Sequence, residues 1–138
     1  MTQTYYLEKL PNEPIVIVTM TAEFDTQRDL SPGNPKAYNY FEANPDGITA
    51  PVFFINDFSA ATLTLEDLIF GATVTSRSAK SVYHHPLVRE VIMIPSSDLH
   101  KAAAEGLRSD VFGNVALQII DTLEEALAYA RQQIAQSR

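Results

Sequence analysis

Hydroxyl and carboxylate side chains gather in one short stretch of the chain, residues 56–67, directly after the apolar run 52–55. In open α/β sheets, ligands and partners commonly meet the protein at the carboxyl ends of strands. A strand that ends here would therefore place these side chains where a binding site is expected. The candidate site residues are Asp57, Ser59, Thr62, Thr64, Glu66 and Asp67.

The motifs of common enzyme classes do not occur in this chain. It has no cysteine, which excludes disulfides, thiolate catalysis and cysteine-based metal sites. It has no Gly-x-Ser-x-Gly elbow, Walker loop or dinucleotide-binding fingerprint. His84, His85 and His100 lack a metal-ligand spacing, so structural or surface roles are favoured. We expect no cofactor, no metal ion and no enzymatic activity. An enzyme would have to use polar residues such as Asp57 and His84, for which no nucleophile–base pair can be named.

The composition describes an ordinary globular protein with an acidic balance. The 138 residues are 46% hydrophobic, which predicts one soluble domain over residues 1–138. No segment approaches the roughly 20 apolar residues of a membrane span. The net charge of −7 would repel phosphate backbones and anionic lipids, so nucleic acid is not an expected partner. The N-terminus has no secretory signal pattern, and a cytoplasmic location is the default expectation.

Five apolar runs are typical of strands. Runs 5–10 and 15–20 flank Pro11-Asn-Glu-Pro14, a sequence that favours a tight reversal, so the chain is expected to open with a hairpin. The runs at 52–56, 91–94 and 115–120 are each followed by a segment of helical periodicity. This order predicts an α/β domain with a mixed sheet of four or five strands and helices mainly on one face.

Three helix starts can be recognised from capping residues. Thr64 with Asp67 and Thr122 with Glu125 have the spacing of a capping box, and a further helix opens at 96–98. The apolar stripe of each helix predicts the side that lies on the sheet. The stripes comprise Leu65, Leu68, Ile69 and Ala72 in the first helix, Leu99, Ala102, Ala103, Gly106 and Leu107 in the second, and Leu123, Ala126, Leu127, Ala130 and Ile134 in the third.

Residues 25–51 form a long polar excursion, in which only 36–42 has the pattern of a short helix. Its aromatic side chains Tyr38, Tyr40 and Phe41 need a surface to rest on. Loops longer than about 12–15 residues are commonly functional or disordered. The excursion is therefore interpreted as a lid, a partner-binding arm or a dimer contact.

The passage Asp57-Phe-Ser59-Ala-Ala-Thr62 resembles the Asp-x-Ser-x-x-Thr passage between the central strand and the following helix in the SpoIIAA-like branch of the STAS (anti-anti-sigma factor) fold. Residues 85–91, 111–114 and 121–130 also look like this pattern, so the resemblance covers roughly residues 52 to 134. It implies an α/β regulatory domain that acts by binding other proteins.

The start of the first helix departs from that family. Phosphorylatable members carry Asp-Ser-Ser-Gly there, whereas this chain has Leu-Glu-Asp-Leu at 65–68 and no serine at the switch position. Glu66 and Asp67 place negative charge at a helix N-terminus, which is favourable by about 0.3–1 kcal/mol. They either mimic a permanent phosphate or are ordinary first-turn acids. A retained switch would have to use Ser59, Thr62 or Thr64.

Two functions from different classes follow. The first is a non-enzymatic regulatory or protein-interaction module that makes contacts through the loop 57–67. The alternative is a carrier of a small apolar ligand or lipid, with the segment 34–44 as its lid.

The basic, hydroxyl-rich stretch 76–85 would dock an anion or an acidic partner, or else is an ordinary polar connection. A homodimer is a further expectation, because exposed sheet edges need covering. The aromatic residues that motivate a carrier are Tyr38, Tyr40, Phe41, Phe54 and Phe58.

Overall fold

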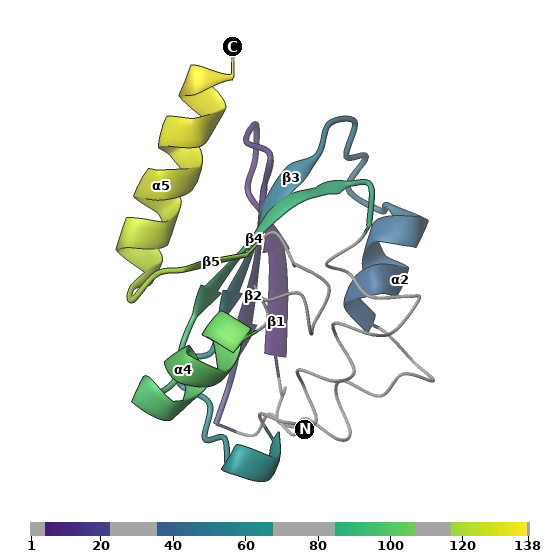
Figure 1. The fold of residues 1–138 in the computed structure, drawn as a ribbon. Coiled ribbons are helices and arrows are strands. Elements are labelled where there is room, and N and C mark those ends of the chain that lie inside the picture. Colours follow the sequence, from purple (N-terminus) through teal and green to yellow (C-terminus); the bar gives the residue numbers. More distant parts are fainter. Residues whose placement is uncertain (1–4, 23–35, 68–84, 107–116, 138) are drawn as a thin grey trace.

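The computed structural model describes residues 5–22, 36–67, 85–106 and 117–137. These residues form an α/β domain built around a five-stranded sheet (Figure 1). The predicted helix positions 68–72, His84 and the basic stretch 76–84 lie outside these ranges. The elements in chain order are β1 (Tyr5–Lys9), β2 (Ile15–Met20), α2 (Lys36–Ala43), β3 (Val52–Asp57), β4 (Val88–Ile94), α4 (Asp98–Gly106), β5 (Leu117–Ile119) and α5 (Leu123–Gln136).

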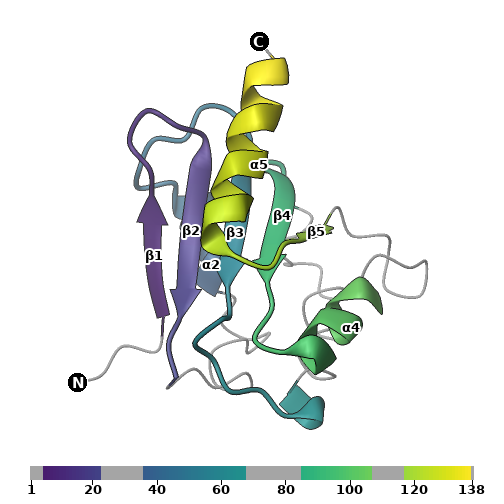
Figure 2. The same cartoon turned by 90° about the vertical axis from the view of Figure 1, so that its left-hand side faces the viewer.

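The strands follow one another across the sheet in chain order, β1-β2-β3-β4-β5 (Figure 2). β1 pairs with β2 antiparallel, and the other neighbours pair in parallel. The predicted hairpin and mixed sheet are thus confirmed. In the hairpin turn Asn12 has φ 62°, a left-handed conformation that asparagine tolerates better than most residues.

The central strand β3 is buried along its whole length, as expected for a parallel strand covered on both sides. Because side chains alternate along a strand, Phe54 belongs to one apolar cluster and Phe53 to another on the opposite face. β2 and β4 extend the first cluster with Val16 and Val91. An apolar strand of this kind needs a cover on each face of the sheet.

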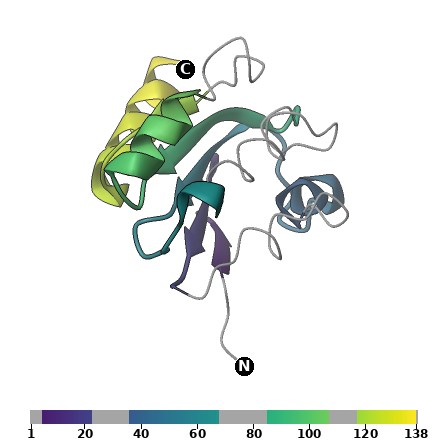
Figure 3. The ribbon, with the colours of Figure 1, turned by 60° about the horizontal axis from the view of Figure 1, so that its bottom comes forward.

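Helices α2 and α5 provide that cover on opposite faces, whereas helices mainly on one face were expected (Figures 1 and 3). Phe41 of α2 is 1% exposed, and its ring centroid lies 5.3 Å from that of Phe54. Ala126 and Ala130 of α5 are fully buried in the cluster of Phe53. The difference arises because the excursion is not only polar: its short helix carries a core aromatic. None of the described helices combines the length and the apolar character needed to cross a membrane.

The two C-terminal helices test the stripe predictions with different results. α5 begins as predicted, since Thr122 Oγ1 accepts a hydrogen bond from the Glu125 backbone N–H at 3.1 Å. In α4 the prediction is wrong, because Leu99 is 49% exposed and Ala102 is also exposed. His100 takes the inward position and is 5% exposed. One residue along a helix turns the side chain by about 100°, so the inward face is rotated relative to the predicted stripe.

Candidate functional site

The candidate loop begins with a turn made by Asp57, the last residue of β3. Its Oδ1 accepts hydrogen bonds from the backbone N–H of Ser59 at 3.0 Å and from Ser59 Oγ at 2.7 Å. Such Asx turns redirect the chain and satisfy its first free donor. Asp57 is buried and Ser59 is exposed. The pair therefore shapes the exit of the chain from the sheet.

Phe58 anchors the loop to α4. Its side chain is 7% exposed, and its ring meets that of His100 edge-on, with centroids 4.9 Å apart. The backbone N–H of Ser96 donates to His100 Nδ1 at 3.0 Å, so the proton of the neutral ring lies on Nε2. Burial lowers the pKa of His100 to about 4. The imidazole is thus a neutral structural part of this end of the sheet, which is the first of the two roles, structural or surface, expected for the histidines.

The loop ends in the predicted capping box. Thr64 Oγ1 accepts from the Asp67 backbone N–H at 3.1 Å, and Asp67 Oδ2 accepts from the Thr64 backbone N–H at 2.9 Å. Residues 65–67 are helical, which confirms the predicted start. Leu65 is 56% exposed, so it does not lie on the inward stripe where it was expected. Thr64 and Asp67 are used to start the helix.

Thr62 and Glu66 differ from the other four candidate residues. Both side chains are exposed, and within the described residues neither makes a hydrogen bond or ion pair. The loop therefore presents a hydroxyl, a carboxylate and the aliphatic side chain of Leu65 on a backbone that is anchored by the buried Phe58 and Ala61 and braced by the local capping box. This presentation suits contact with another molecule more than proton transfer.

A second polar cluster joins α2 to the chain before β4, and sequence reasoning missed it. His85 is 5% exposed; its Nδ1 accepts from the Leu87 backbone N–H and its Nε2 donates to Glu42 Oε1, both at 3.0 Å. The ring of Tyr38 lies 5.0 Å from that of His85, edge-on. Burial and then the neighbouring Glu42 carboxylate raise the pKa of Tyr38. Glu42 and His85 are 43 positions apart, and no local pattern signals their contact.

Three of the five aromatic residues that suggested a ligand carrier are buried in the core. Phe41, Phe54 and Phe58 belong to one cluster, and Tyr40 lies partly buried against it. The Tyr40 hydroxyl donates to Asp46 Oδ2 at 2.6 Å. Burial, together with this bond to a carboxylate, raises the pKa of Tyr40 beyond its usual range. Residues 36–44 therefore form part of the wall of the domain, while 34 and 35 lie outside the described residues.

In the described parts of the chain, no three histidine or acidic side chains converge as a metal site would require. A scan of the chain against protein-family models matches no family, and comparisons with curated proteins and with solved structures find no similar protein. The resemblance to SpoIIAA-like domains consequently stays a prediction from the sequence. The site has to be interpreted from its own geometry.

Proposed function

We propose that the protein is a non-enzymatic interaction module of regulatory type, and that the loop 57–67 is its contact surface. The observation that carries the proposal is a loop that is anchored by the buried Phe58 and Ala61 and still exposes Thr62, Leu65 and Glu66. A surface that is ordered before binding loses less conformational entropy when a partner docks. A protein partner is the class of ligand that suits a projecting loop of mixed polar and aliphatic character.

The buried histidines already use ring nitrogens in hydrogen bonds within the protein, which supports interaction over catalysis. His100 is buried, and its Nδ1 accepts from the backbone of Ser96. In the second cluster both ring nitrogens of His85 are engaged. A nucleophile or general base needs a group that can reach a substrate proton. These groups instead hold the fold together.

Charge favours a partner with a basic surface. Glu66 is exposed on the loop, and Asp98 is exposed at the start of α4. Figures 1 and 2 place residues 65–67 and α4 at the same end of the molecule, beyond the carboxyl ends of β3 and β4. The whole chain has a net charge of −7, which adds a long-range attraction for a positive partner. Leu65 would supply the apolar contact.

The three hydroxyls considered for a phosphate switch are not equivalent. A phosphate on Ser59 would sit beside the Asp57 carboxylate, and one on Thr64 would break the capping box. Thr62 accepts a phosphate with the least disruption, because its exposed hydroxyl makes no bond within the described residues. Regulation of this loop by phosphorylation would therefore act at Thr62.

The carrier alternative has less support. Its lid would have to lift Phe41, which is 1% exposed and packs edge-on against Phe54. Exposing a phenylalanine of this kind costs about 1.5–3 kcal/mol, and an empty space left in the core costs more. The interaction module needs no such rearrangement.

A photoreactive amino acid placed at Glu66, in the full chain expressed in its own host, tests the contact surface. The same residue placed at Glu8, exposed on the edge strand β1, is the matched control. We expect a cross-linked protein from position 66 and none of the same mass from position 8. The partner is then purified, and its dissociation constant is measured for the unmodified chain and for Glu66→Lys.

Charge reversal at Glu66 should weaken binding by about tenfold or more if the partner surface is basic. Glu8→Lys changes the net charge equally and should leave the affinity close to that of the unmodified chain. Equal affinities for the two variants, or equal cross-linking from positions 66 and 8, would contradict the proposal. Circular dichroism spectra show that each variant is folded.

A further inference from the structure

A shallow, largely open cleft of about 430 Å³ lies at the other end of the sheet, where the parallel strands begin. Its volume lies within the range of small-molecule sites, about 300–1,000 Å³. Prolines precede β2, β3 and β4 there, and the last turns of α5 close the cleft from one side. The apolar lining used below consists of Pro14, Pro51, Pro86, Val88 and Ile134.

Arg89 is the charged residue of this lining, and a β-bulge places it there. Val52 pairs with Val88 and Phe53 pairs with Glu90, so Arg89 is the extra residue in β4. Bulges redirect a side chain and are frequent beside functional sites. The guanidinium carbon of Arg89 lies 4.8 Å from the centroid of the Phe53 ring. A guanidinium held over a ring keeps the donors at its edge available for a planar anion.

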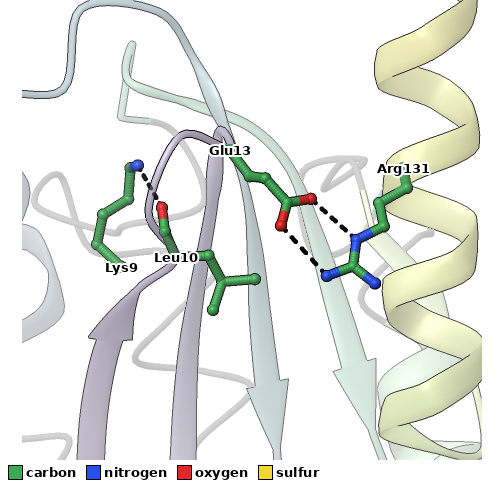
Figure 4. A network of polar contacts seen from close by, with 4 residues as sticks. All are labelled: Lys9, Leu10, Glu13 and Arg131. Carbon is green, nitrogen blue, oxygen red and sulfur yellow. Dashed lines mark hydrogen bonds and ion pairs between the residues drawn. The ribbon is translucent and has the colours of Figure 1, made fainter.

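The carboxylates next to the cleft in sequence already have other partners. Glu13 receives two hydrogen bonds from Arg131, from Nε at 2.9 Å and from Nη2 at 3.2 Å (Figure 4). Glu90 accepts from Tyr129 at 2.6 Å and from Gln118 at 3.2 Å. Within the described residues, Arg89 has no ion pair.

Among the prolines and the side chains of the lining, the other donors are absent or committed. The prolines have no backbone N–H, and the Ser137 hydroxyl donates to the Gln133 carbonyl at 2.9 Å. Arg89 is thus the side chain in the lining that can bind an anion. Apart from Arg89 and Ser137 the side chains of the lining are apolar, so the complementary ligand has one negative group and an apolar body.

We propose that this cleft binds a small amphipathic carboxylate, whose carboxylate is held by Arg89 and whose apolar part lies against the prolines and Ile134. The site is separate from the loop 57–67 and does not depend on its function. Charge-assisted bonds of this kind are about twice as strong as neutral ones. Arg89 supplies a local positive charge in a chain whose net charge is −7.

Titration of the ¹⁵N-labelled full chain with octanoate, followed by amide chemical shifts, tests the site. We expect the largest shifts at Val88, Arg89, Ile134 and Ser137. The neutral probe 1-octanol has the same chain length and should bind about tenfold more weakly or worse, as expected for loss of a charge-assisted hydrogen bond. Equal affinities for the two probes, or octanoate shifts confined to other regions, would overturn the proposal.

Arg89→Gln should reduce octanoate affinity by about tenfold or more and leave octanol affinity unchanged. Lys101→Gln is the matched control, because it removes one positive charge on α4 and should leave both affinities unchanged. Ile134→Ser should weaken both probes, since it removes an apolar wall and keeps Arg89. Loss of octanoate binding in Lys101→Gln equal to that in Arg89→Gln would show a general charge effect and contradict the site.

Discussion

The two ends of the sheet expose different kinds of surface. At the carboxyl end, the loop 57–67 projects from the sheet and is held by an Asx turn, a capping box and the buried Phe58. At the amino end, prolines and the end of α5 leave a recess with Arg89 at its side. A projecting loop needs anchors in the core and local bonds for its backbone. A recess needs rigid walls and a donor without an internal partner. The two proposals thus assign opposite charge preferences to the two ends of one sheet.

Among the substitutions considered, removal of the Phe58 ring, which anchors the loop 57–67, should have the largest effect on the free energy of unfolding. Phe58→Ala deletes a buried ring that contacts His100, and we expect it to lower the free energy of unfolding by about 3–4 kcal/mol. The apolar contacts are lost and a cavity is left between the loop and α4. Urea denaturation followed by circular dichroism measures the change.

Leu65→Ala is the control for this prediction on the same loop. Leu65 is 56% exposed, so its truncation should change the free energy of unfolding by about 0.5 kcal/mol or less. Similar losses in the two variants would mean that the loop is not anchored through Phe58. The loop at the carboxyl end would then lack the core attachment that distinguishes it from the cleft at the amino end.

Acidification should weaken the carboxyl end first. The folded-state pKa of His100 is lowered by burial from 6.5 to about 4, so the unfolded chain binds more protons between these values. Its contribution to stability is present above pH 6.5 and is lost as the pH falls toward 4. The expected loss is up to about 3 kcal/mol, from the linkage of proton binding to folding. Urea denaturation at several pH values measures it.

His100→Gln should flatten this pH dependence, because glutamine does not titrate. The described groups that face the imidazole, from Ser96 and Phe58, do not titrate in this range either. An unchanged slope of stability against pH in the variant would assign the effect to other groups. The amino-end pair Glu13–Arg131 should respond at lower pH, since the hydrogen bond from Arg131 lowers the pKa of Glu13 from 4.5.

Local signals were sufficient for much of the fold and for the ends of the loop. The hairpin, the strand runs and both capping boxes were predicted, because turn residues, apolar runs and capping pairs act over a few positions. The buried face of α5 also followed from its apolar stripe, with Ala126 and Ala130 inward. For the site, the sequence predicted which residues form the loop and that Thr64 caps the helix.

Features that depend on distant contacts could not be predicted. His100, instead of Leu99, turns inward because Phe58, from the loop after β3, meets its ring. α2 covers the second face because Phe41 packs on Phe54, and His85 binds Glu42 across 43 positions. The cleft is formed by several separate segments and a bulge, none of which is recognisable from its own sequence.

The smallest effect should come from the ion pair at the amino end. Arg131→Gln removes the exposed pair with Glu13, and surface pairs of this kind contribute little because water and salt screen them. We expect a midpoint of urea unfolding close to that of the unmodified chain. A double-mutant cycle with Glu13→Gln, at low and at high salt, isolates the coupling, and any coupling should disappear at high salt. A large coupling that persists at high salt would show that this end, like the carboxyl end, depends on a specific polar anchor. The rigid walls of the cleft would then depend on the pair and not on its prolines and apolar packing.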